Sequence, residues 1–376
     1  MSKKKLLIFH PALAPYRVDQ FNAIARLFEL HVVFIFDNVW NHKFDQSKLQ
    51  EKLIFEYSFL LKGPRIKGRV FRFGMVKKIR QVNPEIIIGY EYSFTTLYLI
   101  LLKKLGIIKQ QIGSMIDDSL EISRHIQSGM RDRVRSFSVK HLDYLIVLSD
   151  EVADFYQTKF SLDKKRVIVS PLFQDPLRLR KDAGKLVPLA KTHFQKFNLK
   201  NKKVLLFVGR FIPEKGLLNF IEIITPILKE DPEVRLVLVG DGTEREKIQG
   251  SIEKHGVQNS VVLAGRYEGD ELLAWYHCAS AFALPSFYEP FGAVVNEALI
   301  FGLKVFCSQF AGSSYLTTPG EDALFNPNDI DQSRLALKIF LGHIPVKESI
   351  DETLAPVRMR IDYNKVFDGW KKSMYD

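Results

Sequence analysis

The stretch LPSFYEPFGAVVNEALIFG, residues 284–302, carries the most information on the fold and its site. An apolar run ends at Leu284, a loop with Pro285 and Pro290 follows, and a helix is predicted to begin near Gly292. The first N–H groups of a helix lack intrahelical partners, and the helix dipole makes that end positive. This helix start is therefore suited to binding a phosphate.

Two carboxylates flank this phosphate-sized site. Glu289 precedes the predicted helix, and Glu297 follows eight positions later in its second turn. Carboxylates repel phosphate but accept hydrogen bonds from hydroxyl groups. A ligand with phosphates and many hydroxyls, such as a nucleotide sugar, satisfies both requirements, and Gly292 would let it approach the backbone.

A second stretch, VLLFVGRFIPEKG at 204–216, predicts a strand, a loop with Arg210 and Lys215, and a helix that begins at Gly216. Ligands of parallel sheets bind at the carboxyl ends of the strands. Both cations are therefore placed to neutralise a diphosphate. The alternative is an exposed basic loop without a ligand.

Apolar strands alternate with amphipathic helices along the whole chain, as in parallel sheets covered on both faces. The pattern runs twice, so we predict an α/β protein with two Rossmann-like, doubly wound domains. The predicted parts are a first domain at 1–175, a linker at 176–200, a second domain at 201–355 and a C-terminal helix at 356–376. Strands are predicted at 5–9, 30–36, 86–89, 111–116, 144–148, 167–169, 204–208, 234–239, 261–264, 281–284 and 304–307.

Length and composition fit this organisation. The chain has 376 residues, and 46% of them are hydrophobic, which suffices for two cores of roughly 100–200 residues each. The two cysteines, Cys278 and Cys307, provide no disulfide framework and fit a cytoplasmic location; both are expected to be buried fillers. The most apolar stretch, residues 94–102, is too short to span a bilayer.

Positive charge is concentrated in the first half of the chain. Residues 1–180 hold 30 Lys and Arg against 18 Asp and Glu, whereas the remainder is nearly balanced. The segment Lys62–Arg80 has eight cations, no acid and interleaved apolar side chains. We expect it to contact an anionic membrane surface or acceptor, so that the protein lies peripherally on the inner face of the membrane. A solvated helix face is the alternative, and no nucleic acid partner is expected.

Four segments together resemble the family 4, or group 1, glycosyltransferases. They are VGRFIPEKG, VLVGDG, LPSFYEPFGAVVNEAL and FAGSSYLTTPGEDALFNPND, and they span most of residues 200–330. HPALAPYRVDQFNAIA at 10–25 resembles the opening strand, loop and helix of the same family. The resemblance implies the GT-B fold, in which two Rossmann-like domains face a central cleft. It places the donor on the second domain and the acceptor on the first, with the last helix packing back on the first.

The resemblance also implies roles for individual residues. Arg210 and Lys215 would bind the diphosphate of the donor, and Glu297 the ribose hydroxyls. The backbone of Val294 would reach a phosphate, and the loop after residues 263–267 would border the nucleobase. The transferred sugar would be held by Glu289 with the backbone of Phe291, Gly292 and Ala293.

On the acceptor side, the predicted strand that begins at Gln111 runs out at Asp117, where the family places a polar residue near the sugar. The resemblance therefore makes Asp117 a catalytic candidate together with Glu289, Arg210 and Lys215. Its neighbour Asp118 is the second choice. Further candidates for the acceptor side are His10, Tyr16 and Arg17. Members often carry His where this chain has Asp117, and an acid where it has Tyr315.

The implied activity is a retaining, hexosyltransferase-type transfer from a nucleotide sugar, UDP- or GDP-linked. The acceptor would be lipid-linked or a cell-surface polysaccharide or lipopolysaccharide. No cofactor and no obligatory metal are expected, because Asp329 in the Asp-x-Asp pattern at 329–331 is better placed to cap a helix. The alternatives are another GT-B enzyme, such as a nucleotide-sugar 2-epimerase or a phosphorylase, and a non-catalytic basic module that binds membranes.

Overall fold

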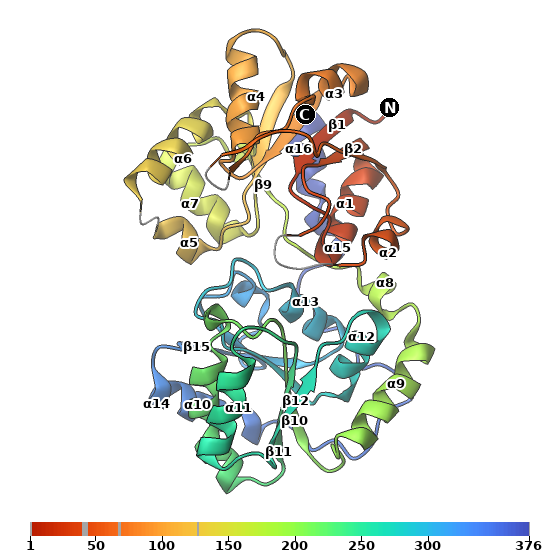
Figure 1. Cartoon of the computed structure of the whole chain (residues 1–376), viewed down its shortest axis with the longest axis vertical. Helices are drawn as coiled ribbons and strands as arrows, with labels where there is room; N and C mark the ends of the chain where they lie inside the picture. Colours follow the sequence, from red (N-terminus) through yellow and green to blue (C-terminus); the bar gives the residue numbers. More distant parts are fainter. Residues whose placement is uncertain (1, 40–43, 67–68, 126–127, 376) are drawn as a thin grey trace. The chain divides into compact units, whose positions relative to one another are not determined.

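The computed structural model describes residues 2–39, 44–66, 69–125 and 128–375. The chain forms two compact units (Figure 1). Unit 1 consists of Met1–Gln174 and Asp362–Asp376, and unit 2 of Asp175–Ile361. Each unit is built on one parallel sheet with helices, which confirms the predicted α/β class with two doubly wound sheets.

The sheet of unit 1 has seven parallel strands in the order β3-β2-β1-β6-β7-β8-β9. The order reverses direction between β1 and β6, which makes their carboxyl ends the switch point of the sheet. The strands are β1 (Lys5–His10), β2 (Glu29–Phe34), β3 (Glu56–Phe59), β6 (Ile86–Tyr90), β7 (Gln111–Met115), β8 (Tyr144–Val147) and β9 (Val167–Val169). A separate antiparallel pair joins β4 (Arg65–Ile66) to β5 (Arg69–Val70).

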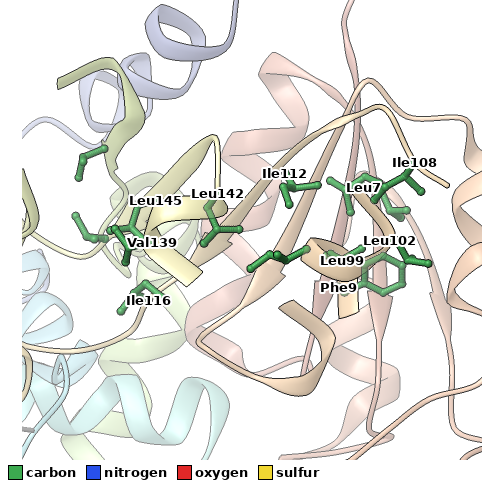
Figure 2. Close-up of a cluster of buried hydrophobic side chains, with 14 of the residues drawn as sticks. Leu7, Phe9, Leu99, Leu102, Ile108, Ile112, Ile116, Val139, Leu142 and Leu145 are labelled. Atoms are coloured by element: carbon green, nitrogen blue, oxygen red, sulfur yellow. The ribbon is translucent and has the colours of Figure 1, made fainter. Parts of the chain in front are cut away.

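One face of this sheet is covered by α3, α4, α6 and α7, whose apolar side chains form one buried cluster with those of the strands (Figure 2). Strand residues such as Leu7 and Ile112 meet Leu99 and Leu102 of α4 in this cluster. The helices of unit 1 are α1 (Pro15–Leu27), α2 (Gln46–Gln50), α3 (Met75–Val82), α4 (Phe94–Lys104), α5 (Leu120–Arg124), α6 (Gly129–His141), α7 (Asp150–Phe160), the 3-10 turn η1 (Lys164–Arg166), α15 (Tyr363–Val366) and α16 (Asp368–Tyr375).

The C-terminal helices α15 and α16 belong to unit 1. Trp370 is fully buried, with its ring 6.3 Å from that of Phe28, and the hydroxyl of Tyr363 donates to the carbonyl of Asp19 at 2.8 Å. The buried side of this segment is therefore the side that the i, i+3, i+4, i+7 spacing marks as apolar. Residues 356–361, which the sequence groups with this helix, instead remain on unit 2.

The sheet of unit 2 has six parallel strands in the order β12-β11-β10-β13-β14-β15, and its order reverses between β10 and β13. The elements are β10 (Lys203–Val208), β11 (Val234–Val239), β12 (Val261–Gly265), β13 (Ala281–Leu284), β14 (Lys304–Ser308), β15 (Ala323–Phe325), α8 (Pro176–Arg180), α9 (Ala183–Lys196), η2 (Pro213–Lys215), α10 (Leu217–Glu230), α11 (Arg245–His255), α12 (Gly269–Cys278), α13 (Ala293–Ile300), η3 (Ser314–Leu316) and α14 (Ile330–Gly342).

Residues 176–200, predicted as a linker from their prolines, form α8 and α9 within unit 2. Pro176 stands in the first turn of α8, where a missing N–H does no harm. Pro188 lies inside α9, but the buried stripe of that helix packs on α12, with His193 stacked on Trp275 at 4.6 Å. Packing of the apolar face thus overrides the helix-breaking tendency of proline.

The structure gives part of the basic segment Lys62–Arg80 internal roles. Arg72 donates to the carbonyls of Ile35 at 2.8 Å and Leu61 at 2.5 Å, and Met75 and Ile79 belong to the buried cluster. Lys67 and Gly68 lie outside the described residues. Within the described ranges, no helix combines the length and the apolar character that crossing a bilayer requires.

Candidate active site

The two informative stretches of unit 2 meet because β10 and β13 are neighbours in the sheet. The backbone N–H groups of Phe287 and Tyr288 donate to the carbonyl of Glu214 at 2.9 and 3.3 Å. Gly216 has φ +65°, and a Cβ there would stand 2.5 Å from the carbonyl oxygen of Pro285. The loop after β13 is thereby seated on the turn after β10.

This contact brings Lys215 and Glu289 together. The Nζ of Lys215 donates to Oε2 of Glu289, and both side chains are largely buried, 15% and 11% exposed. Arg210, directly after β10, is exposed. The structure therefore places one of the two predicted cations at the predicted sugar-binding carboxylate and leaves the other on the surface of the same strand end.

The start of α13 is left open by the chain. Gly292 is its N-cap with φ +90°, and among the residues that the structure describes no side chain caps it. A Cβ at Gly292 would lie 2.9 Å from the side chains of Leu284 and Ser313, so this close packing requires glycine. The N–H groups of Ala293 and Val294 stand in the first turn, where an anion finds donors.

Glu297, one turn further along α13, is held by a residue that sequence reasoning missed. The hydroxyl of Tyr276, on α12, donates to Oε2 of Glu297 at 2.5 Å. Tyr276 is fully buried, and burial followed by the charge of Glu297 raises its pKa well above the ordinary value. Because 21 residues and a strand separate the two, no spacing rule would have paired them.

The loop after β14 runs along the same site. Gly312 N–H donates to the carbonyl of Glu289 at 3.0 Å, and Ser313 N–H to that of Phe291 at 2.7 Å. A Cβ at Gly312 would stand 1.9 Å from the carbonyl oxygen of Pro290. Tyr315, where the resemblance expects an acid, instead has its carbonyl bound by Arg360 at 2.8 Å.

In unit 1 the predicted acceptor residues gather at the switch point of the sheet. Arg17, on α1, is 1% exposed and donates to Oδ2 of Asp117, which follows β7. His10 ends β1, and its ring lies 5.2 Å from that of Tyr90 at the end of β6. Burial and then the charge of Arg17 lower the pKa of His10 well below its usual value. Tyr16 lies next to this group, with its ring 6.0 Å from Arg17.

Glu91 is a third carboxyl group at this switch point, and sequence reasoning missed it. Its backbone has φ +50°, a strained conformation, and its Oε1 accepts from the N–H of Asp117 at 2.9 Å. Burial, followed by the charges of Asp118 and Asp117, raises the pKa of Glu91 well above its ordinary value. Burial and then the charge of Asp117 raise the pKa of Asp118 to about 6. The position of Glu91 just after a predicted strand was the available signal.

The remaining motifs have structural roles. Asp329 caps α14 by accepting from the N–H of Gln332 at 3.0 Å, as predicted, and Asp331 pairs with Arg334 at 2.9 Å. Both Cys278 and Cys307 are buried free thiols, as predicted. Within the described ranges, no three His, Cys, Asp or Glu side chains are grouped so that they could hold a metal ion.

Comparison with solved structures assigns the fold. The chain resembles the Anabaena protein Alr3699/HepE, solved with UDP, at a TM-score of 0.67 and 18% identity over 90% of each chain. It also resembles the lipopolysaccharide outer core galactosyltransferase WaaB, at 0.66 and 16% identity over 99% of each chain. With its two parallel sheets, the protein therefore has the α/β, two-domain GT-B fold.

Sequence comparison finds similarity for unit 2. Residues 190–344 match the family model of group 1 glycosyl transferases. The 2-deoxystreptamine N-acetyl-D-glucosaminyltransferase of Niallia circulans is 30% identical over 136 residues, 36% of this chain and 35% of that protein. The chain matches about a third or less of the length of this and the other leading curated relatives. Residues 190–344, most of unit 2, are thus similar in sequence to group 1 glycosyl transferases.

Proposed function

We propose that the protein is a nucleotide-sugar-dependent glycosyltransferase. The observation that carries the proposal is the contact of Lys215 with Glu289 beside the uncapped start of α13. A cation and free backbone donors suit a diphosphate, and a carboxylate suits sugar hydroxyls. The match of unit 2 to group 1 glycosyl transferases and the UDP complex of a protein with the same fold support it.

Each residue of this site would have one task. Lys215 and Arg210 would neutralise the diphosphate together with the N–H groups of Ala293 and Val294. Glu289, with the backbone of Phe291 and Gly292, would hold the sugar, and Glu297, fixed by Tyr276, would accept from the ribose hydroxyls. A donor would replace the Lys215–Glu289 pair with its own phosphate and hydroxyl groups.

The proposed transfer breaks the bond between the anomeric carbon and the diphosphate oxygen and forms one to an acceptor oxygen. In the retaining version, the leaving phosphate takes the proton of the acceptor hydroxyl on the same face. Charge builds up on the leaving diphosphate, so stabilisation by Lys215, Arg210 and the α13 donors is the main contribution of the protein. We propose that this suffices without a metal ion or cofactor.

For the acceptor, we propose a lipid-linked or cell-surface polysaccharide or lipopolysaccharide. The acceptor would bind near Asp117, with Asp118, His10, Tyr16 and Arg17 around it. A basic unit 1 supports an acceptor presented at an anionic membrane, with the exposed cations of Lys62–Arg80 as one contact. The fold shared with a lipopolysaccharide galactosyltransferase agrees with this class but is no test of it.

The test is a ligand screen followed by a product analysis. We expect thermal-shift measurements with UDP-, GDP-, ADP- and CMP-sugars to show stabilisation by one nucleoside diphosphate sugar. At a hundredfold excess over Kd, binding should raise the free energy of unfolding by about 2.7 kcal/mol. The donor is then incubated with and without acceptor in EDTA, and NMR determines the anomeric configuration of the product. Donor conversion without acceptor would indicate an epimerase, and no shift with any nucleotide sugar would reject the proposal.

A further inference from the structure

The outer surface of α4 and α6 in unit 1 is both apolar and cationic. We call it the α4–α6 face and define it by four cations and apolar residues that are 41–71% exposed. Such large apolar side chains exposed side by side are unusual on a surface without a partner. The members are Leu101, Lys104, Leu105, Ile107, Lys109, Met130, Arg133, Phe137 and Lys140.

These residues form one face because of helix geometry. Met130, Arg133, Phe137 and Lys140 follow at spacings of three and four, so they line one side of α6. The Nζ of Lys104 lies 4.8 Å from the ring centroid of Phe137, which joins α4 to α6. The opposite sides of both helices point inward, where Leu99, Leu102 and Val139 belong to the buried cluster (Figure 2).

The charge of the face has one sign. Residues 92–116 contain no acid. The one acid of α6, Asp132, accepts from Arg135 at 2.5 Å and from Lys159 at 3.2 Å. At the end of α6, a hollow of about 450 Å³ is lined by Lys140, Lys165 and Arg166 and by one acid, Asp143, which pairs with Lys103 at 2.5 Å.

We propose that the α4–α6 face docks on an anionic lipid bilayer. Leu105, Ile107 and Phe137 would enter the interfacial region, and Lys104, Arg133 and Lys140 would contact lipid phosphates. Apolar insertion and attraction to anionic lipid reinforce each other in peripheral proteins, and long cationic side chains reach the headgroups from beside the apolar ones.

The charge of the face also argues against a second copy of the chain as its occupant. In a twofold dimer each residue patch meets its own copy. A patch that contains Lys104, Arg133 and Lys140 would then meet an equally cationic copy of itself, without an acid of the face to pair with. An anionic surface removes that repulsion, so the bilayer is the occupant that the charges favour.

The α4–α6 face lies next to the basic segment Lys62–Arg80 but consists of other residues. The ring of Phe71 packs on that of Tyr98 of α4 at 5.2 Å, so the basic segment borders α4 at this residue. Arg72, Met75 and Ile79 of that segment serve the interior of unit 1. The apolar side chains that we expect to enter the bilayer are therefore those of the α4–α6 face. The inference uses no residue of the proposed donor or acceptor sites, so its failure would leave the proposed transfer untouched.

The experiment is flotation of the full chain with vesicles of phosphatidylcholine alone or of an equimolar mixture with phosphatidylglycerol. The wild type should float with the anionic vesicles and lose binding in high salt. Lys104→Glu/Arg133→Glu/Lys140→Glu should weaken partitioning at least about a hundredfold. Leu105→Ser/Phe137→Ser should weaken it about tenfold or more, because two apolar side chains no longer insert.

Matched variants on unit 2 serve as controls. Leu335→Ser/Ile339→Ser removes apolar side chains of α14 that are at least 58% exposed, and Lys229→Glu/Lys254→Glu reverses exposed cations; both should float like the wild type. A charge reversal at Lys62, Arg65, Lys77 and Arg80 should weaken binding less than reversal at the face. Three results would overturn the proposal: unchanged flotation of both face variants, binding indifferent to anionic lipid, or a concentration-dependent dimer that the face variants abolish.

Discussion

Lys215 and Glu289, 74 positions apart, form a largely buried ion pair at the junction of the loops that follow β10 and β13. The pair exists because the sheet places these strands side by side and because Phe287 and Tyr288 bind the carbonyl of Glu214. In the proposed function, the cation serves the diphosphate and the carboxylate serves the sugar. On this proposal, a donor would separate the two opposite charges that the site holds against each other.

Removing the cations should impair catalysis. Lys215→Ala and Arg210→Ala are each expected to lower kcat about 10²–10³-fold, because charge on the leaving diphosphate loses a stabilising partner. Release of nucleoside diphosphate is the measurement. Lys229→Ala, at an exposed position of unit 2, should retain the wild-type rate. Near-wild-type turnover of either site variant would show that its cation does not serve the diphosphate.

The ion pair of Lys215 and Glu289 should also affect the free energy of unfolding. Lys215→Met leaves a largely buried carboxylate without its partner and should lower the free energy of unfolding by about 1–3 kcal/mol. Lys215→Met/Glu289→Gln removes the unpaired charge and should recover most of this loss while remaining inactive. Urea unfolding of the two variants gives the comparison. Equal stability of the two variants would mean that the unpaired carboxylate of Glu289 does not destabilise the fold.

Tyr276 should act as a positioning residue for Glu297. Tyr276→Phe removes the hydroxyl that fixes this carboxylate and is expected to weaken UDP binding about tenfold, the size of one hydrogen bond to a charged group. Binding of inorganic pyrophosphate, which has no ribose, should not change. Calorimetry with both ligands separates the two cases. If the affinities for both fell together, Tyr276 would be supporting the whole site and not the ribose contact.

Glycine at 312 should be essential to the loop beside the proposed sugar site. Gly312→Ala would bring Cβ to 1.9 Å from the carbonyl oxygen of Pro290, which forces the backbone apart. We expect a loss of about 2–4 kcal/mol in stability and of donor binding. Gly250→Ala in α11 meets nothing within 4 Å and should stabilise by about 0.4–1 kcal/mol. Thermal unfolding of the two variants should therefore move in opposite directions.

Local patterns predicted the parts of the fold that are buried on both sides. The central strands of both sheets follow from continuous apolar runs, and the open helix start at Gly292 follows from its neighbours in sequence. The edge strands β3 and β15 were missed, because EYSF and ALF are short and partly exposed. The pairs Tyr276–Glu297 and Glu91–Asp117 depend on how one element is rotated against another, which no local spacing encodes.

Burial of Trp370 should tie the stability of unit 1 to the C-terminus of the chain. Trp370→Ala leaves a cavity beside Phe28 and is expected to lower the stability of unit 1 by about 3–5 kcal/mol. Trp275→Ala should do the same to unit 2. Limited proteolysis with mapped cleavage sites shows which unit opens first. Cleavage in unit 2 caused by Trp370→Ala would contradict the assignment of this helix to unit 1.

The carboxyl cluster of unit 1 predicts how stability depends on pH. The pKa of Asp118 is raised to about 6, whereas in the unfolded chain it lies near its ordinary value of 3.8. Between these values the folded state holds more protons than the unfolded state. The contribution of Asp118 is therefore fully present below about pH 4 and is lost as the pH rises through about 6. Burial, followed by the charges of Asp118 and Asp117, raises the pKa of Glu91 well above its ordinary value, so Glu91 changes stability in the same direction.

Asp118→Asn mimics the neutral carboxyl group and should abolish this term. The stability of the wild type relative to Asp118→Asn should fall, on the order of 2 kcal/mol, between about pH 4 and pH 7. The contribution of Asp132 to stability changes with pH in the opposite direction, because hydrogen bonds from Arg135 and Lys159 lower the pKa of Asp132. The stability of the wild type relative to Asp132→Asn should therefore fall as the pH drops below the ordinary aspartate value of 3.8. Denaturant unfolding from about pH 2 to pH 7 measures both differences. A flat difference for Asp118→Asn would show that the three carboxyl groups do not share one buried environment.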